Sequence, residues 1–140
     1  MDKIKTFKMV KGEDLNHHGT LFAGRCAEWF VETSFIAATQ NLDPKNVVCL
    51  KIYGLEFLRP AQIGTILSFD SQIVHTGKTS LTVYTEVFDI KNTNKMCLDG
   101  FVTFCNIDEN GKAFPHKLNF EAKTEREKEL NKKLLSLLKK

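Results

Sequence analysis

A short polar run ahead of a long apolar segment carries side chains that could do chemistry. Asn16, His17 and His18 belong to the run, and the apolar segment contains Ala23 and Gly24. If that segment is a helix, its first backbone N–H groups are unpaired and could stabilise a carbonyl oxygen as negative charge develops on it. Small residues at 23 and 24 would let a substrate approach these amides closely, and the Asn16 amide could orient the reactants.

Each polar residue of this run also has a simpler interpretation. Asn16 could only cap a turn that Gly19 permits. His17 or His18 could act as a base near neutral pH, or could be an exposed loop residue without a catalytic role. Two adjacent histidines without cysteine or carboxylate partners at ligand spacing are weak indications of a metal site, so none is predicted.

Candidate general bases lie further along the apolar segment. Arg25, Glu28 and Glu32 share one polar stripe, because residues three and four positions apart are neighbours on a helix. One interpretation is a solvated stripe with an Arg25–Glu28 ion pair. The other is that Glu28 or Glu32 takes a proton from water, a role that burial of the carboxylate would favour.

The element that must position these groups is a helix predicted over residues 20–39. Apolar residues recur there at helical spacing, and Trp29 and Phe30 are expected to be mostly buried. Pro44 lies in the segment that ends the helix. A second helix is expected in the tail over 121–140, with acidic residues first and basic residues last. Its apolar stripe could pack on its own sheet or on another copy; the residues are Leu130, Leu134, Leu137 and Leu138.

The remaining segments alternate apolar and polar residues as β-strands do. Strands are predicted over residues 4–10, 47–58, 66–74, 80–90 and 96–107. Turns are predicted at 75–78, 91–95 and 108–111. A β-α-β-β-β-β order with short turns indicates an α+β fold, in which one helix packs on an antiparallel sheet, as one domain over residues 1–140 with a tail from about 118.

Composition limits the class of protein. The 140 residues are 42% hydrophobic with a net charge of +3, which suits one folded domain and does not indicate nucleic acid. We find no apolar run of the roughly 18 residues that span a membrane and no signal segment, so a cytoplasmic protein is expected. No C-x-x-C pair occurs, which favours reduced cysteines without zinc: Cys26, Cys49, Cys97 and Cys105.

Five motifs in order resemble those of one enzyme family. The run N-H-H-G-T-L-F-A-G from Asn16 to Gly24 resembles the N-x-x-G-x-x-F-G-G segment of hotdog-fold acyl-CoA thioesterases, the group of cytosolic long-chain and YciA-like hydrolases. The E-W-F-V-E run at 28–32 is similar to the family's E-W-M-D-E. The likeness spans about Phe7 to Leu118, and its further motifs lie at 55–60, 75–80 and 101–112.

The resemblance implies a hotdog fold, in which an antiparallel sheet wraps around one long central helix, here with a C-terminal helix added. It implies hydrolysis of acyl-CoA to free acid and coenzyme A, with no metal or redox cofactor. It also implies a homodimer with active sites between two copies, or a tetramer or hexamer built from such dimers. The basic tail could then lie near CoA, and four residues are candidates for CoA contacts: Arg59, Lys78, Thr79 and Ser80.

One position departs from the family pattern. The acidic residue that the family uses as base or nucleophile falls at Val31, which can do neither job. Glu32 is turned about 100° from that position around the helix, and Glu28 about 60°. Either a neighbour such as Glu28, Glu32 or His17 replaces the acid, or the chain is a non-catalytic acyl-CoA-binding or regulatory protein.

Overall fold

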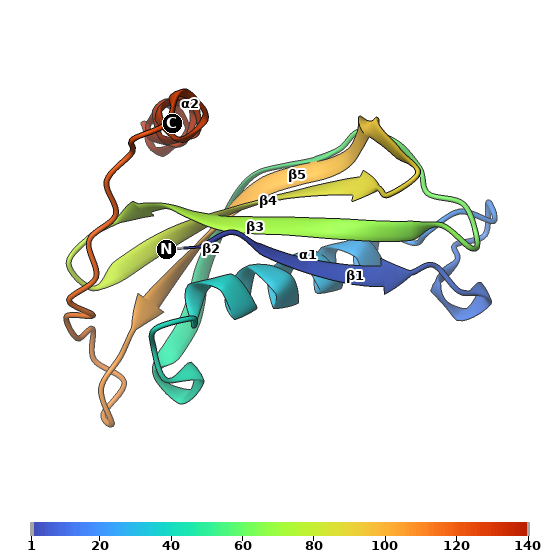
Figure 1. Cartoon of the computed structure of the whole chain (residues 1–140). Helices are drawn as coiled ribbons and strands as arrows, with labels where there is room; N and C mark the ends of the chain where they lie inside the picture. Colours follow the sequence, from blue (N-terminus) through green and yellow to red (C-terminus); the bar gives the residue numbers. More distant parts are fainter. Residues whose placement is uncertain (1, 140) are drawn as a thin grey trace.

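The structure is a computed structural model that describes residues 2–139, in which a five-stranded sheet has one helix on each side (Figure 1). The strand order is β1-β3-β4-β5-β2, and neighbouring strands are antiparallel. The strands are β1 (Ile4–Met9), β2 (Val47–Phe57), β3 (Ile66–Thr76), β4 (Ser80–Asp89) and β5 (Asn92–Asn106). The helices are α1 (Ala23–Ala38) and α2 (Glu125–Leu138), with short 3-10 helices η1 (Gly12–Asp14) and η2 (Pro44–Asn46).

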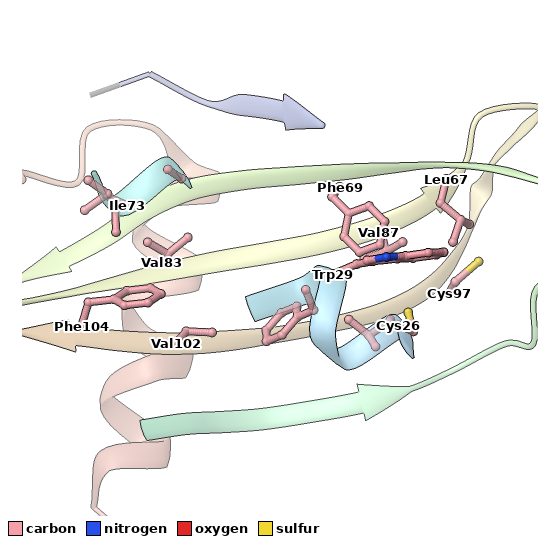
Figure 2. Close-up of a cluster of buried hydrophobic side chains, with 14 of the residues drawn as sticks. Cys26, Trp29, Leu67, Phe69, Ile73, Val83, Val87, Cys97, Val102 and Phe104 are labelled. Atoms are coloured by element: carbon pink, nitrogen blue, oxygen red, sulfur yellow. The ribbon is translucent and has the colours of Figure 1, made fainter. Parts of the chain in front are cut away.

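The main core lies between α1 and the sheet. Trp29 is 6% exposed and Phe30 is fully buried, which confirms the burial predicted for both rings. The Trp29 ring meets the edge of Phe69 at a centroid distance of 6.3 Å (Figure 2). Burying two such rings contributes several kcal/mol, on the order of 2 kcal/mol for each. The sheet therefore curves over one side of α1, while the opposite side, which carries Glu28 and Glu32, is exposed.

The helix begins at Ala23, so the predicted start at residue 20 was three residues too early. The Thr20 N–H donates to the Asn16 side-chain oxygen at 3.2 Å, and the Leu21 N–H donates to the Ala61 carbonyl at 2.9 Å. Asparagine side chains that accept local backbone N–H groups compete with helix formation. The three residues before Ala23 are therefore tied to neighbouring loops.

Two predicted turns also shift. The turn at 91–95 is wrong, because the chain reverses at residues 90 and 91, and Asn92 already pairs with Asp89 across the hairpin. The Asp89 carboxylate accepts the Lys91 N–H at 2.9 Å and closes this tight turn. At the other end of the sheet, β3 continues to Thr76, two residues beyond the predicted strand.

The C-terminal helix begins at residue 125, later than the predicted 121. The Thr124 hydroxyl accepts the Glu127 N–H at 3.0 Å, while the Glu127 carboxylate accepts the Thr124 N–H at 2.9 Å, which forms a capping box. This backbone N–H lowers the pKa of Glu127. No helix within residues 2–139 is long and apolar enough to cross a membrane.

The apolar stripe of α2 packs on the sheet face opposite α1, so the first of its two predicted roles is confirmed. Leu130 and Leu134 are 2% and 0% exposed, in a second core with Val74, Tyr84 and Phe101. A side-chain hydrogen bond from Asn131 to the Val74 carbonyl, at 2.9 Å, holds the helix against β3. Strands β3 to β5 are consequently covered on both faces at this end.

Removing the Leu134 side chain is expected to destabilise the fold strongly. Leu134→Ala deletes a fully buried side chain and leaves a cavity under α2, so the free energy of unfolding should fall by about 2–5 kcal/mol. Urea unfolding measures this difference. Leu135→Ala is the matched control, because Leu135 is 42% exposed on the same helix and should change stability little. Equal effects of both changes would contradict the docking of α2.

A row of buried carboxylates crosses the same outer face of the sheet. Asp70 pairs with Glu86 across strands, and Glu86 pairs with Asp99, although like charges directly opposite one another repel. Cations from both ends of the chain offset this repulsion, and the contacts are Lys3 and Lys5 to Asp70, Lys3 and Arg126 to Glu86, and Lys133 to Asp99. The Tyr84 hydroxyl also donates to Asp99 at 2.8 Å.

Candidate active site

The loop before α1 is organised by Asn16. Its side-chain oxygen accepts the His18 N–H at 2.9 Å and the Thr20 N–H at 3.2 Å, and its NH₂ group donates to the Thr20 hydroxyl at 3.2 Å. Gly19 completes the turn with φ +80°, a left-handed conformation that favours glycine. Asn16 thus closes a turn, and it also lines the cavity described below, so the two predicted roles are compatible.

The start of α1 offers unpaired donors. Within residues 2–139, the N–H groups of Ala23, Gly24 and Arg25 have no hydrogen-bond partner, and Phe22 at the N-cap supplies none from its side chain. A Cβ at position 24 would lie 2.6 Å from the Phe22 ring, so only glycine lets that ring fold over the helix start. These free amides are the feature that can stabilise an oxyanion.

A cavity of about 250 Å³ opens beside the first turn of α1. The chain segment after β2 forms one wall, and the loop that contains Asn16 forms the other. The exposed part of the lining combines Arg59 with the apolar side chains of Phe57 and Leu58, and the buried part is apolar, with Leu67 fully buried. The rim includes Asn16, Ala23 and Arg59, and the floor includes Cys26, Leu67 and Cys97.

The two cysteines of the floor were missed as site residues by the sequence analysis. Cys26 lies three positions after Ala23, a spacing that places both on one side of α1. Cys97 reaches the cavity only through the pairing of strands, which no local pattern reveals. Burial raises the pKa of Cys26 to about 12 and also raises the pKa of Cys97, so both thiols stay protonated near neutral pH.

The predicted bases do not line this cavity in a single chain. Glu28 is exposed, and the Glu32 carboxylate, 56% exposed, lies 3.9 Å from the Lys8 ammonium. His17 and His18 are exposed in the loop, with ring centroids 3.9 Å apart. One chain therefore brings Asn16 and the helix amides together and leaves the carboxylates and imidazoles outside.

Arg25 does not form the ion pair with Glu28 that one interpretation predicted. Its Nε lies 3.5 Å from the carboxylate of Asp14, which is 3% exposed beneath the loop. Asp14 also accepts the Lys11 N–H at 2.9 Å. The ion pair of Arg25 with Asp14 therefore anchors the loop that contains Asn16 beside the cavity. Glu28 has no ion pair among the residues that the structure describes.

The four candidates for CoA contacts divide into two groups. Arg59 is at the cavity rim, where its N–H donates to the Cys97 carbonyl. Lys78 and Thr79 form the turn between β3 and β4, and Ser80 begins β4 opposite Cys105. Eight residues of β5 separate Cys97 from Cys105, which corresponds to about 26 Å. A single chain therefore holds Arg59 and the Lys78 turn at opposite ends.

Comparisons with known proteins agree with this architecture. An apo-hexameric acyl-CoA thioesterase superposes with a TM-score of 0.83 at 27% identity, over 98% of this chain and 88% of that chain. An acyl-CoA hydrolase of Staphylococcus aureus, solved with butyryl coenzyme A, coenzyme A and coenzyme A disulfide, gives a TM-score of 0.84 at 23% identity, over 98% and 84%. The fold is therefore the predicted hotdog fold.

Sequence comparison assigns the family. The model of the thioesterase superfamily matches residues 18–95, and the chain belongs to this superfamily. The uncharacterized acyl-CoA thioester hydrolase YkhA of Bacillus subtilis is 25% identical over 105 residues, which are 73% of this chain but only 60% of the relative. An uncharacterized acyl-CoA thioester hydrolase of Buchnera aphidicola is 27% identical over 115 residues, or 78% of this chain and 83% of the relative.

Proposed function

We propose that this protein hydrolyses acyl-CoA thioesters to free carboxylic acids and coenzyme A. The observation that carries the proposal is the cavity, in which Asn16 and the start of α1, with its unpaired amides, stand beside a mostly apolar lining. A thioester has the matching polarity, with a carbonyl at the head of an apolar chain. The names of the two sequence relatives and the ligands of the S. aureus structure support the same substrate class.

The proposed reaction begins with the thioester carbonyl at the rim. The amides of Ala23 and Gly24 stabilise negative charge on its oxygen while water attacks the carbon, and Asn16 orients the reactants. A carboxylate takes the proton of the water, the C–S bond breaks, and the CoA sulfur leaves with a proton. This route needs no metal or redox cofactor, and coenzyme A takes part only as a portion of the substrate and product.

The proposal includes a homodimer, because no carboxylate of residues 2–139 lines the cavity in one chain. Strand β2 lies at the edge of the sheet and exposes apolar side chains, with Leu50 61% exposed, Ile52 39% and Val48 37%. Long apolar edges of this kind are sites for pairing with another strand. Antiparallel pairing of two β2 edges would bring the Lys78 turn of one copy toward the Arg59 end of the other. It would also turn the exposed side of α1 toward the second cavity.

Sedimentation at micromolar concentration is expected to show a dimer or a dimer-built tetramer or hexamer, not a monomer of 15.9 kDa. The hexameric state of one structural neighbour supports the larger assemblies. Leu50→Lys places a charge at the pairing edge and should increase the monomer fraction. Leu135→Lys adds the same charge on the exposed side of α2 and should leave the assembly intact. A wild-type monomer would refute the shared site.

The contacts with CoA phosphates are tested by charge removal. Arg59→Ala and Lys78→Ala should each raise KM more than they lower kcat. The reason is that contacts with the CoA phosphates are equally strong in the ground state and in the transition state. Added salt should weaken binding further, since charges are screened beyond about 8 Å at physiological ionic strength. Lys132→Ala, at an exposed position of α2, is the matched control. Unchanged KM values in both variants would remove these residues from the site.

A specific observation favours a second function, binding of acyl-CoA without hydrolysis. In the S. aureus hydrolase, structures exist for alanine variants of an asparagine and of an aspartate fifteen positions further along. The residue fifteen positions after Asn16 is Val31, which cannot act as a base. A thiol-release assay over a panel of acyl-CoA chain lengths distinguishes the two functions. Release shows an enzyme, whereas binding without release shows a regulatory module.

We also place the protein in the cytoplasm. Its four cysteines are free thiols, three of them buried. A reducing compartment keeps such thiols unpaired.

A further inference from the structure

We infer that His116 is a positioning residue for coenzyme A, because it holds the turn that contains Lys78 and Thr79 in the conformation that receives the CoA phosphates. The inference rests on the proposed function, in which this turn contacts CoA. His116 was not among the predicted site residues, and it belongs to the chain that follows the sheet. Its effect on the ligand passes through the backbone of the turn.

The chain between β5 and α2 passes beside the turn that joins β3 to β4 (Figure 1). We call residues 114–120 the connecting segment. The Phe114 N–H donates to the Asn106 carbonyl at 2.9 Å, and the Phe120 N–H donates to the Thr76 hydroxyl at 2.9 Å. The connecting segment is therefore fixed at both ends against the sheet, and His116 lies between the two attachments.

His116 is the only buried histidine of the four in the chain, with 7% of its surface exposed. Its ring Nε2 lies 2.7 Å from the Ser80 carbonyl oxygen, and its Nδ1 accepts the Leu118 N–H at 2.9 Å. Because a carbonyl oxygen can only accept, the ring is neutral and carries its proton on Nε2. The His116 N–H also donates to the Lys78 carbonyl at 3.3 Å. One residue therefore binds two carbonyl groups of the turn.

The remaining bonds of the turn leave its donors free. The Ser80 carbonyl also accepts the Gly77 N–H at 2.9 Å, and the Thr79 carbonyl accepts the Asn106 N–H at 2.8 Å. Within residues 2–139, the N–H groups of Lys78 and Thr79 have no hydrogen-bond partner. Successive free N–H groups favour anions, and a lysine ammonium adds a charge-assisted bond to phosphate. With its carbonyls held by the protein, the turn presents donors to a phosphate.

The backbone beside His116 is in an uncommon conformation. Lys117 has φ 61°, and it is the only residue other than glycine with a left-handed φ within the described part of the chain. Such a conformation costs free energy and persists where the surrounding contacts hold it. Here it lets the Leu118 N–H reach the imidazole of His116. The bond in turn orients the ring, so that Nε2 points at the Ser80 carbonyl.

Hydrogen–deuterium exchange tests the positioning without any ligand. His116→Asn keeps an oxygen near the position of Nδ1 for the Leu118 N–H, but it loses the donor to the Ser80 carbonyl. Exchange of the Gly77 amide, followed by mass spectrometry of a peptide over 74–81, should become about tenfold faster. His116→Gln is the matched control, because its amide N–H lies near the position of Nε2 and should keep exchange close to that of the wild type.

Titration with coenzyme A measures the effect on binding. His116→Asn should raise the Kd by about fivefold. In the thiol-release assay it should raise KM similarly and leave kcat within about twofold. Adding Lys78→Ala should give less than the product of the two single effects, because both changes act on the same turn. Thr76→Val removes the attachment at Phe120 but no bond of the turn, so it should leave the Kd unchanged.

The outcomes separate the inference from the proposed function. Unchanged Gly77 exchange in a folded His116→Asn protein would overturn the inference and leave the proposed function intact. Weaker binding in Lys78→Ala but not in His116→Asn would also overturn it. Unchanged Kd values in both variants would remove the turn from the CoA site, and hydrolysis by the wild type would still show an enzyme. Thermal unfolding checks the fold, and His116→Ala, which also lacks the ring donor, takes the place of His116→Asn if that variant is unfolded.

Discussion

Replacing Glu28 by Gln is expected to lower kcat by about 10² to 10⁴, the usual effect of losing a general base, with little change in KM. Among the residues that the structure describes, Glu28 has no ion pair, whereas Glu32 lies 3.9 Å from Lys8. Glu28 also lies one turn nearer the unpaired amides at the start of α1. A free carboxylate on the exposed side of α1 is available to the cavity of a second copy in the proposed dimer.

The matched control for this prediction is Glu32→Gln, which makes the same chemical change on the same helix. It should lower kcat less than Glu28→Gln does. The reverse order would assign the base to Glu32. Full activity in both variants would contradict a carboxylate base and would leave His17 or His18 as the nearest alternative.

Val31→Asp tests the same assignment by adding an acid at the position where the sequence departs from the family pattern. If the chain is an enzyme with a displaced base, the change should raise hydrolysis modestly at most. If the chain is a binding protein, the change should create activity in a protein that had almost none. Val31 is half-buried against the main core, so the new carboxylate should also lower the free energy of unfolding.

Asn16→Ala is expected to lower kcat by about 10² to 10³, the range found when a group that stabilises the transition state is removed. KM should change little, because the interaction strengthens as charge develops on the carbonyl oxygen. The same measurement of thiol release reports both parameters. The interpretation requires a control, since Asn16 also holds the loop through the N–H groups of His18 and Thr20.

Asn16→Asp supplies that control. The carboxylate keeps an oxygen that can accept both loop N–H groups, but it loses the NH₂ donor. A large loss of kcat in both variants indicates that the donor acts on the reactants. Near-normal activity of Asn16→Asp would show that Asn16 serves only to close the loop.

The sequence predicted the fold well, because burial imposes regular patterns. The spacing of Trp29 and Phe30 identified the buried side of α1, and the alternation in β3 and β4 identified their inner faces. The predicted ends of helices and turns were wrong where side chains form hydrogen bonds with the nearby backbone. Asn16 accepts the Thr20 N–H and keeps Thr20 out of the helix. The Asp89 carboxylate accepts the Lys91 N–H and closes a turn that was predicted further along the chain, at 91–95.

The candidate site was harder to predict, since it depends on contacts between segments far apart in the chain. Asn16 and Ala23 come from one continuous segment, and the structure places both at the cavity. Cys97 enters the cavity through the register of β5, which a single sequence does not reveal. The turn that contains Lys78 resembles a motif of the family, and a role in the site was therefore predicted for it. In one chain, however, this turn lies about 26 Å along the sheet from Arg59.

The carboxylate row on the outer face makes the two ends of the chain depend on each other. Asp70, Glu86 and Asp99 are neutralised by lysines near the N-terminus and by Arg126 and Lys133 of α2. Loss of either group of cations would leave buried like charges unbalanced. Substitutions at the two termini should therefore be inherited together with changes in the row, and a lineage that shortens its tail should also have replaced Glu86 or Asp99.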